Sequence, residues 1–364
     1  MMNRTQERVT LILEDGTTFS GYSFGYFGET DGEVVFNTGM VGYPETLTDP
    51  SYAGQILVTT YPLIGNYGVP PKVYDNSLLL HYESDKIQAK ALIVSDYSEN
   101  YSHWNAERSL SDWMVEEKIP GIFGIDTRAL TRKLRDSGTM LGRIIQGDQV
   151  NDSDLKVIIE DPNKTDLVGS VCTKEVVEYK KGDTKIVLVD CGVKNNIIRA
   201  FQGRDITVIR VPYDYDFLDI EANGIMISNG PGDPKMCKST IEHTKLAMKK
   251  GIPILGVCLG SQIIGLAAGM DTYKLKYGHR SLNQPVNEAG TNRSYITSQN
   301  HGFAVDSETL PQDWREWFTN DNDGSNEGII HISKPFFGTQ FHPEASPGPD
   351  DTEFIFDMFV RSLK

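Results

Sequence analysis

Short, nearly continuous apolar runs mark the second half of the chain. Four of them, separated by stretches with the composition of helices, cover residues 186–189, 206–209, 224–227 and 252–255. Strands of a parallel sheet covered by helices on both faces have this pattern, because neither face of such a strand meets water. We therefore predict an α/β domain over residues 185–364, with an open, mostly parallel sheet flanked by helices.

A different pattern in the first part of the chain predicts a mixed α/β domain over residues 1–145. Apolar side chains alternate at Val9, Leu11 and Leu13, a turn follows at Asp15-Gly16, and apolar residues resume at 19–22. Alternation on both sides of such a turn is typical of a β-hairpin.

Two amphipathic helices are predicted in the same domain. One covers residues 104–118, with Trp113 on its apolar side, and the aromatic residues of this segment are expected in the core. The other starts at Asp126 as N-cap and ends just before Gly138.

Residues 146–184 are polar and charged, and they include the run Lys180-Lys181-Gly182-Asp183. This composition predicts a connector between the two domains that carries one short helix.

Composition excludes several classes of protein. A chain of 364 residues with 39% hydrophobic and 23% charged residues is long enough for two domains, and its net charge of −15 argues against nucleic acid as a partner. Residues 1–8 lack the apolar core of a signal peptide, and no apolar run is long enough to span a membrane. We therefore expect a cytoplasmic protein without membrane contact, in which the four cysteines are free thiols.

Cys258 is the first candidate for chemistry. It lies in Gly256-Val257-Cys258-Leu259-Gly260, between an apolar run and a stretch typical of a helix. Small residues on both sides permit a sharp strand-to-helix turn, which would expose the thiol and direct the first N–H groups of the helix toward it. The alternative is a buried cysteine with a packing role only.

His342 and Glu344 supply the groups that a cysteine nucleophile needs. The nucleophile requires an imidazole to hold its proton, and the imidazole requires a carboxylate to orient it. Two residues apart in an extended segment, His342 and Glu344 would point to the same side. A pair of exposed strand residues is the alternative.

The loop Asn229-Gly230-Pro231-Gly232-Asp233-Pro234 follows one of the predicted strands. It is either a plain turn or a source of a backbone N–H that stabilises an oxyanion together with the N–H of Leu259.

These motifs resemble those of class I glutamine amidotransferases, and more narrowly those of the small, glutaminase subunits of carbamoyl-phosphate synthetase. The matching stretches cover nearly the whole chain apart from the connector; they are residues 32–39, 47–52, 61–66, 228–234, 299–305 and 342–349. Two departures are Ser261, where the family often has His, and 281–285, which reads Ser-Leu-Asn-Gln-Pro.

The resemblance implies a Cys-His-Glu triad of Cys258, His342 and Glu344, with an oxyanion hole at Gly230 and Leu259. It also implies that the N-terminal domain contacts the partner and contributes to the glutamine site. The implied glutamine-binding residues are Ser51, Gly230, Gly232, Leu259, Gln262, Asn300, Gly302 and Phe303.

The implied activity is hydrolysis of L-glutamine through a γ-glutamyl thioester, with the ammonia passed to a large subunit that makes carbamoyl phosphate for pyrimidine or arginine synthesis. ATP, bicarbonate and metal are expected only on that large subunit, and no cofactor is expected in this chain. No histidine has a partner at metal-ligand spacing in the sequence, which argues against zinc.

Three alternatives stay open at this point. The chain could serve a different synthetase, such as those for anthranilate or GMP, although these lack the N-terminal domain. It could be a free-standing γ-glutamyl hydrolase, or a catalytically silent scaffolding subunit.

Overall fold

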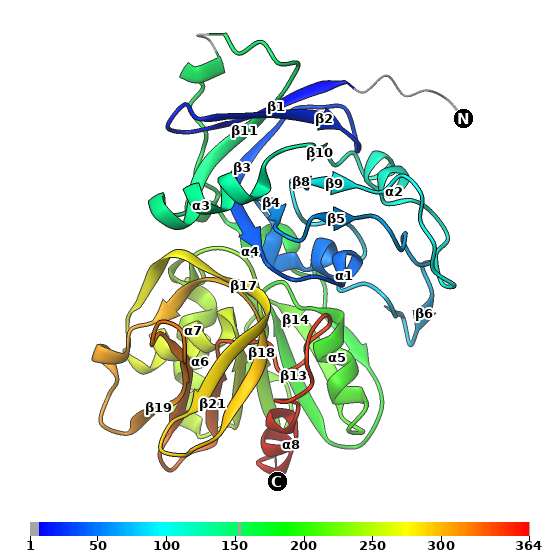
Figure 1. The fold of residues 1–364 in the computed structure, drawn as a ribbon. Helices are drawn as coiled ribbons and strands as arrows, with labels where there is room; N and C mark the ends of the chain where they lie inside the picture. The colour runs from blue at the N-terminus through cyan, green and yellow to red at the C-terminus, as the bar shows by residue number, and fades with distance from the viewer. Residues whose placement is uncertain (1–6, 152–153, 364) are drawn as a thin grey trace. The chain divides into compact units, whose positions relative to one another are not determined.

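The computed structural model describes residues 7–151 and 154–363. The chain forms two compact units, Met1–Lys164 and Thr165–Lys364 (Figure 1). The division falls inside the predicted connector, and the predicted boundaries 1–145, 146–184 and 185–364 stay a prediction. In the described part of the chain, no helix has both the length and the apolar character that crossing a membrane requires.

The first unit is built on a closed barrel whose strand order is β1-β11-β3-β4-β8-β10-β2. The predicted hairpin is confirmed, because β1 and β2 pair antiparallel with Val9 opposite Gly21. The barrel strands are β1 (Arg8–Leu13), β2 (Thr18–Ser23), β3 (Thr30–Asn37), β4 (Gln55–Thr59), β8 (Ala91–Ile93), β10 (Gly121–Phe123) and β11 (Met140–Gln146).

The helices of this unit agree only in part with the prediction. Helix α3 (Thr127–Ser137) is confirmed, since Asp126 Oδ1 accepts a hydrogen bond from Ala129 N and Gly138 ends the helix. Helix α2 (Leu110–Glu116) is shorter than predicted, because Ser109 caps it. Trp113 is buried, but Trp104 lies outside the helix with 89% of its surface exposed, so its predicted place in the core is wrong.

Several short elements complete the first unit around the barrel. They are α1 (Tyr43–Thr48), β5 (Leu63–Ile64), β6 (Tyr74–Asp75), β7 (Leu78–Leu79), β9 (Asp96–Tyr97) and the 3-10 turn η1 (Pro50–Tyr52).

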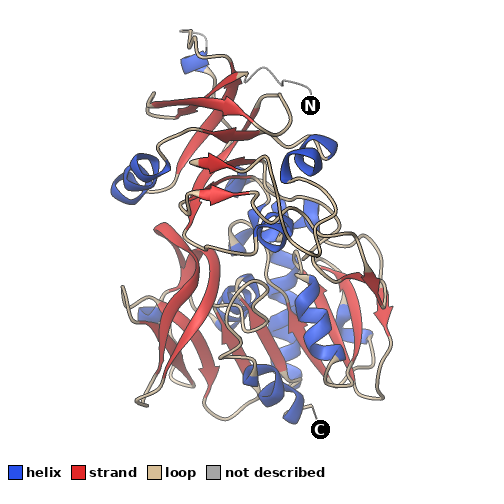
Figure 2. Ribbon diagram, turned by 45° about the vertical axis from the view of Figure 1, so that its right-hand side comes forward, coloured by secondary structure: helices blue, strands red, loops and turns tan. Residues whose placement is uncertain are grey.

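The second unit contains a sheet with helices packed beside it (Figure 2). Its ten strands have the order β12-β14-β13-β15-β16-β21-β20-β19-β17-β18. The four predicted apolar runs give the adjacent parallel strands β14, β13, β15 and β16, and β21 continues them in parallel. The other strands pair antiparallel. The strands are β12 (Val177–Tyr179), β13 (Lys185–Asp190), β14 (Thr207–Pro212), β15 (Gly224–Ile227), β16 (Ile254–Val257), β17 (Thr272–Glu288), β18 (Ser294–Val305), β19 (Trp314–Asn320), β20 (Asn326–His331) and β21 (Phe336–Thr339).

Helices bury the parallel part of this sheet. Val187 and Val189 of β13 pack in one apolar cluster with Ile263 of α7 and Ala247 of α6. The helices of the unit are α4 (Leu167–Val171), α5 (Asn195–Gln202), α6 (Lys238–Lys250), α7 (Leu259–Ala268) and α8 (Phe354–Arg361). Because the central strands are parallel and adjacent, their carboxyl ends lie along a single edge of the sheet, which is where sites form in such folds.

Candidate active site

Cys258 occupies the turn between a strand and a helix. Strand β16 ends at Val257 and α7 begins at Leu259, while Cys258 between them has φ 54° and ψ −107°. A positive φ in a residue other than glycine is a strained conformation that occurs most often at functional sites. The strand-to-helix turn predicted from the sequence is therefore present.

The two glycines of this turn are required by close packing. A Cβ atom on Gly256 would lie 2.5 Å from the carbonyl carbon of Gly260, and a Cβ on Gly260 would lie 2.0 Å from the carbonyl oxygen of Ile227. Both contacts are with backbone atoms that cannot move aside. Only glycine at these positions lets the helix start this close to the strands.

Strand pairing brings His342 to the same edge of the sheet as Cys258. Strands β16 and β21 are parallel, with Val257 opposite Thr339, and the Cys258 N–H donates to the Thr339 carbonyl at 2.7 Å. The chain after β21 then reaches His342, whose N–H donates to the carbonyl of Ser298 at 2.9 Å.

The His342 and Glu344 side chains meet, although not in the way the sequence suggested. The predicted extended segment is wrong, because His342 forms an isolated bridge with Ser298 and the next two residues make a turn. The turn brings Glu344 Oε1 to 2.6 Å from His342 Nδ1. His342 Nε2 has no hydrogen-bond partner among the described residues.

Charge in this buried pair favours an imidazolium and a carboxylate. Burial opposes the charge of His342, but the carboxylate of Glu344 and the nearby Cys258 raise its pKa to about 10. Burial likewise opposes the charge of Glu344, but Lys194 and His342 lower its pKa to about 2. A cationic imidazole beside a thiol stabilises the thiolate, which is the nucleophilic form of cysteine.

Lys194 is a member of this cluster whose role the sequence did not reveal. Its Nζ lies 3.2 Å from Glu344 Oε1, and both side chains are buried. The available signal was its position four residues after the end of β13, at the strand edge where Cys258 and His342 also lie.

The two predicted oxyanion donors are neighbours. A Cβ atom on Gly230 would lie 2.8 Å from Leu259 Cδ2, and Gly230 follows β15, which pairs with β16. Leu259 is the first residue of α7, so its N–H has no partner within the helix ladder. The pair is suited to hold a negative oxygen near the thiol, and this role stays a prediction.

The predicted glutamine-binding residues of the second unit lie on β18, at the start of α7 and in the loop after β15. Cys258 Sγ is 3.6 Å from the carbonyl oxygen of Asn300. Gln262 Nε2 donates to the carbonyl of Phe303 at 2.8 Å and to the side-chain carbonyl of Gln340 at 3.0 Å, and its role in glutamine binding stays a prediction.

The other predicted binding residues stay predictions as well. Gly232 has φ +84°, and Gly302 lies between Asn300 and Phe303 on β18. Ser51 belongs to the first unit, where it is buried in η1 and its N–H donates to Asp49 Oδ1 at 2.9 Å.

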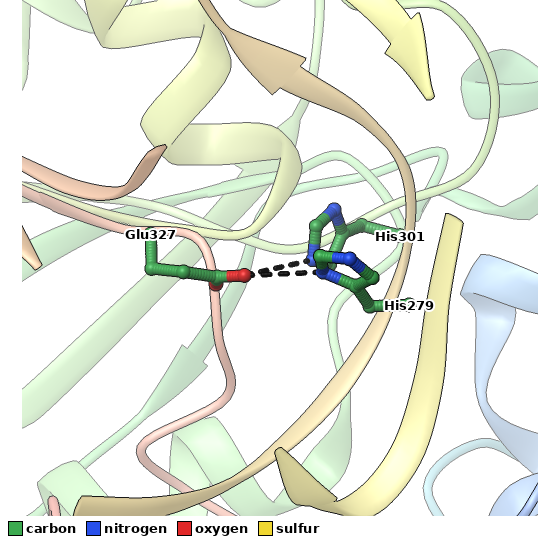
Figure 3. A group of neighbouring side chains, drawn as sticks. All are labelled: His279, His301 and Glu327. Carbon is green, nitrogen blue, oxygen red and sulfur yellow. Dashed lines mark hydrogen bonds and ion pairs between the residues drawn. The ribbon is translucent and has the colours of Figure 1, made fainter. Parts of the chain in front are cut away.

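A second buried cluster appears in the same unit, and spacing along the sequence did not reveal it. His279 on β17, His301 on β18 and Glu327 on β20 lie together (Figure 3). Residues this far apart in sequence have no recognisable ligand spacing, and only the folding of the sheet brings them together.

Comparisons with known proteins agree with this arrangement. Residues 187–362 match the family model of class I glutamine amidotransferases, and residues 11–144 match that of the CPSase domain of the carbamoyl-phosphate synthase small chain. The predicted fold class, with two α/β domains of which the second has the amidotransferase fold, is thereby confirmed.

Relatives of known function resemble the chain over nearly its whole length. The carbamoyl phosphate synthase arginine-specific small chain of Emericella nidulans is 47% identical over 367 residues, which cover 99% of this chain and 81% of that protein. The multifunctional proteins CAD of Squalus acanthias and pyr1-3 of Dictyostelium discoideum are 52% and 49% identical, but this chain spans only 16% and 17% of their length. Because the chain is 47% identical to the small chain of Emericella nidulans and covers 81% of that protein, it belongs to the family of carbamoyl-phosphate synthase small chains.

Proposed function

We propose that the chain is the glutamine-hydrolysing subunit of a carbamoyl-phosphate synthase. The observation that carries the proposal is the meeting of Cys258, His342 and Glu344 at one edge of the sheet, with the nucleophile on a strained turn and the base oriented at 2.6 Å by a carboxylate. A subunit that served only as a scaffold would not require a strained turn at Cys258 or a buried ion pair between His342 and Glu344.

The geometry supports an acyl transfer in two steps. The thiolate of Cys258 attacks the side-chain carboxamide carbon of glutamine, and the N–H groups of Gly230 and Leu259 hold the oxyanion. His342 then gives its proton to the leaving nitrogen, ammonia departs, and a γ-glutamyl thioester remains. Water deprotonated by His342 hydrolyses the thioester to glutamate, while Glu344 keeps the ring in place.

The partner in this proposal is a large, ATP-using synthetase chain. Ammonia released into water at neutral pH becomes ammonium, which is not a nucleophile. The ammonia can therefore react further only if it passes directly to a second active site. We place ATP, bicarbonate and the metal that ATP requires on that partner. We also place the complex in the cytoplasm, in keeping with four cysteines that are all free thiols.

The test is glutamate release by the full chain, alone and together with the synthetase chain. Cys258→Ser is expected to lower turnover by at least about 10³-fold, because a serine hydroxyl beside the same imidazole is a far weaker nucleophile. Cys172→Ser, at a buried cysteine outside the site, is the matched control and should retain turnover. Turnover that survives Cys258→Ser would refute the nucleophile, and failure of the two chains to copurify would refute the partner.

A further inference from the structure

We propose that His279, His301 and Glu327 bind one divalent transition-metal ion, with zinc as the ion that the ligand set favours. One ligand atom from each residue lies within 4.8 Å of the other two, and all three side chains are buried (Figure 3). His279 and His301 are directly opposite each other on the antiparallel strands β17 and β18, so their rings project on the same side of the sheet. None of the three residues belongs to the proposed triad.

Both imidazoles are oriented as metal ligands are. A ligating histidine usually donates its second ring N–H to a carboxylate or a carbonyl, which leaves the first nitrogen free for the ion. His279 Nε2 lies 2.9 Å from Asp323 Oδ2, and His301 Nδ1 lies 2.9 Å from the Phe303 carbonyl. The remaining nitrogens, His279 Nδ1 and His301 Nε2, are 3.1 Å and 3.7 Å from Glu327 Oε1.

Hydrogen bonding around His301 is incomplete without a cation. A neutral imidazole has one N–H to donate, and the Phe303 carbonyl lies 2.9 Å from Nδ1 of His301. His301 Nε2 nevertheless faces two further acceptors, Glu327 Oε1 and, at 3.2 Å, Gln299 Oε1. A cation among these atoms would give the lone pairs of His301 Nε2, Glu327 Oε1 and Gln299 Oε1 a partner.

Glu327 also has an oxygen available for an ion. Its Oε1 accepts from Asn320 Nδ2 at 2.9 Å, whereas Oε2 is buried and has no hydrogen-bond partner among the described residues. Burying a carboxylate oxygen without a hydrogen-bond partner costs free energy of folding. The buried Oε2 of Glu327 therefore requires a physical explanation.

The donor set indicates the class of metal. Two imidazoles and one carboxylate are a common zinc set, whereas calcium and magnesium prefer oxygen ligands alone. Three protein ligands leave a fourth position, for water or for Gln299 Oε1. The ion would join β17, β18 and β20, and Phe303 on β18 shares its carbonyl between His301 and Gln262. Its expected role is to hold in place the strand that carries the predicted glutamine-binding residues.

The experiment uses the full chain with Cys258→Ser, because a thiol and an imidazole in the active site can themselves bind zinc. After treatment with a chelator, the protein is titrated with Co²⁺ and, separately, with Zn²⁺. We expect one ion per chain by elemental analysis, a visible absorption band of Co²⁺ with nitrogen and oxygen ligands, and a rise in Tm. These readouts do not depend on activity, so the proposal can fail while the proposed function stands.

Two variants and one control make the assignment specific. Glu327→Gln should weaken Co²⁺ binding by at least about tenfold, and Asp323→Asn, at a half-exposed position that does not threaten the fold, by about 10- to 100-fold. His331→Asn is the control, because His331 pairs at 3.2 Å with the exposed Asp313 without a third ligand. No stoichiometric binding, or binding that is equal in the Cys258→Ser protein and in both variants made from it, would show a hydrogen-bonded cluster only and overturn the proposal.

Discussion

Two buried clusters of imidazole and carboxylate lie in the second unit, and they differ in the group that completes each of them. In the first, Glu344 Oε1 lies 2.6 Å from His342 Nδ1 and 3.2 Å from the ammonium of Lys194. In the second, Glu327 Oε1 lies near two imidazoles and the amide of Asn320. Among the residues that the structure describes, only the first carboxylate is paired with a permanent cation.

This difference decides what each imidazole can do. The outer nitrogen of His342 has no hydrogen-bond partner among the described residues and is available to the thiol of Cys258, whereas both nitrogens of His279 are directed at carboxylates. Burial opposes the charge of His279, but Asp323 and Glu327 raise its pKa to about 9, so a bound metal ion would have to displace a proton from this ring. In our two proposals, the same two residue types supply a general base in one cluster and metal ligands in the other.

Removing the imidazole from each cluster should separate the two roles most strongly. His342→Asn is expected to lower glutamine turnover by about 10³- to 10⁴-fold, because it removes the base of the triad. His279→Asn should lower turnover by less than about tenfold, since it acts only through the packing of β18. Steady-state glutamate release measures both. Equal losses in the two variants would contradict the distinction drawn between the clusters.

Removing the cation should have the next largest effect. Lys194→Met leaves the buried carboxylate of Glu344 without its ammonium, and breaking one side of a buried pair costs about 3–5 kcal/mol of unfolding free energy. Unfolding in urea measures this cost.

Lys235→Met is the matched control for Lys194→Met. The ion pair of Lys235 with Asp271 is exposed to solvent, so this variant should leave the unfolding free energy nearly unchanged. A similar small change for Lys194→Met would mean that Lys194 is not needed to balance the charge of Glu344.

Much of the first cluster could be predicted from the sequence because its members lie in local motifs. The glycines around Cys258 predict the sharp strand-to-helix turn, and the spacing of His342 and Glu344 predicts that their side chains meet. Family resemblance supplied the oxyanion and glutamine-binding residues, which local pattern alone left as turns. Lys194 was missed because a lysine after a strand has no local feature that predicts which carboxylate it will meet.

The second cluster could not be predicted, for a topological reason. His279 and Glu327 lie on strands that are separated by β19 in the order of the sheet, and they meet through the long, bulged pairing of β17 with β18. The register of such a pairing depends on the packing of the whole sheet. The exposed Trp104 shows the same limit, since the extent of α2 depended on the cap at Ser109 and not on apolar periodicity.

The smallest predicted effect is the pH dependence of the stability that His342 and Glu344 contribute. The pKa of His342 is raised from an ordinary value of 6.5 to about 10, so the stability contributed by its charged form is complete below pH 6.5 and is lost as the pH rises from there to about 10. The pKa of Glu344 is lowered from 4.5 to about 2, so its contribution is present above pH 4.5 and is lost as the pH falls toward 2. One proton changes the unfolding free energy by at most about 1.4 kcal/mol per pH unit.

In the presence of a chelator, the difference in unfolding free energy between wild type and His342→Asn should therefore shrink as the pH rises from 6.5 to 10. Urea unfolding at half-unit pH steps measures that difference, and subtracting the variant cancels the titration of lysines, tyrosines and other cysteines common to both proteins. A difference that stays constant over this range would mean that His342 is neutral in the folded protein, and Cys258 would then have no cationic imidazole beside it.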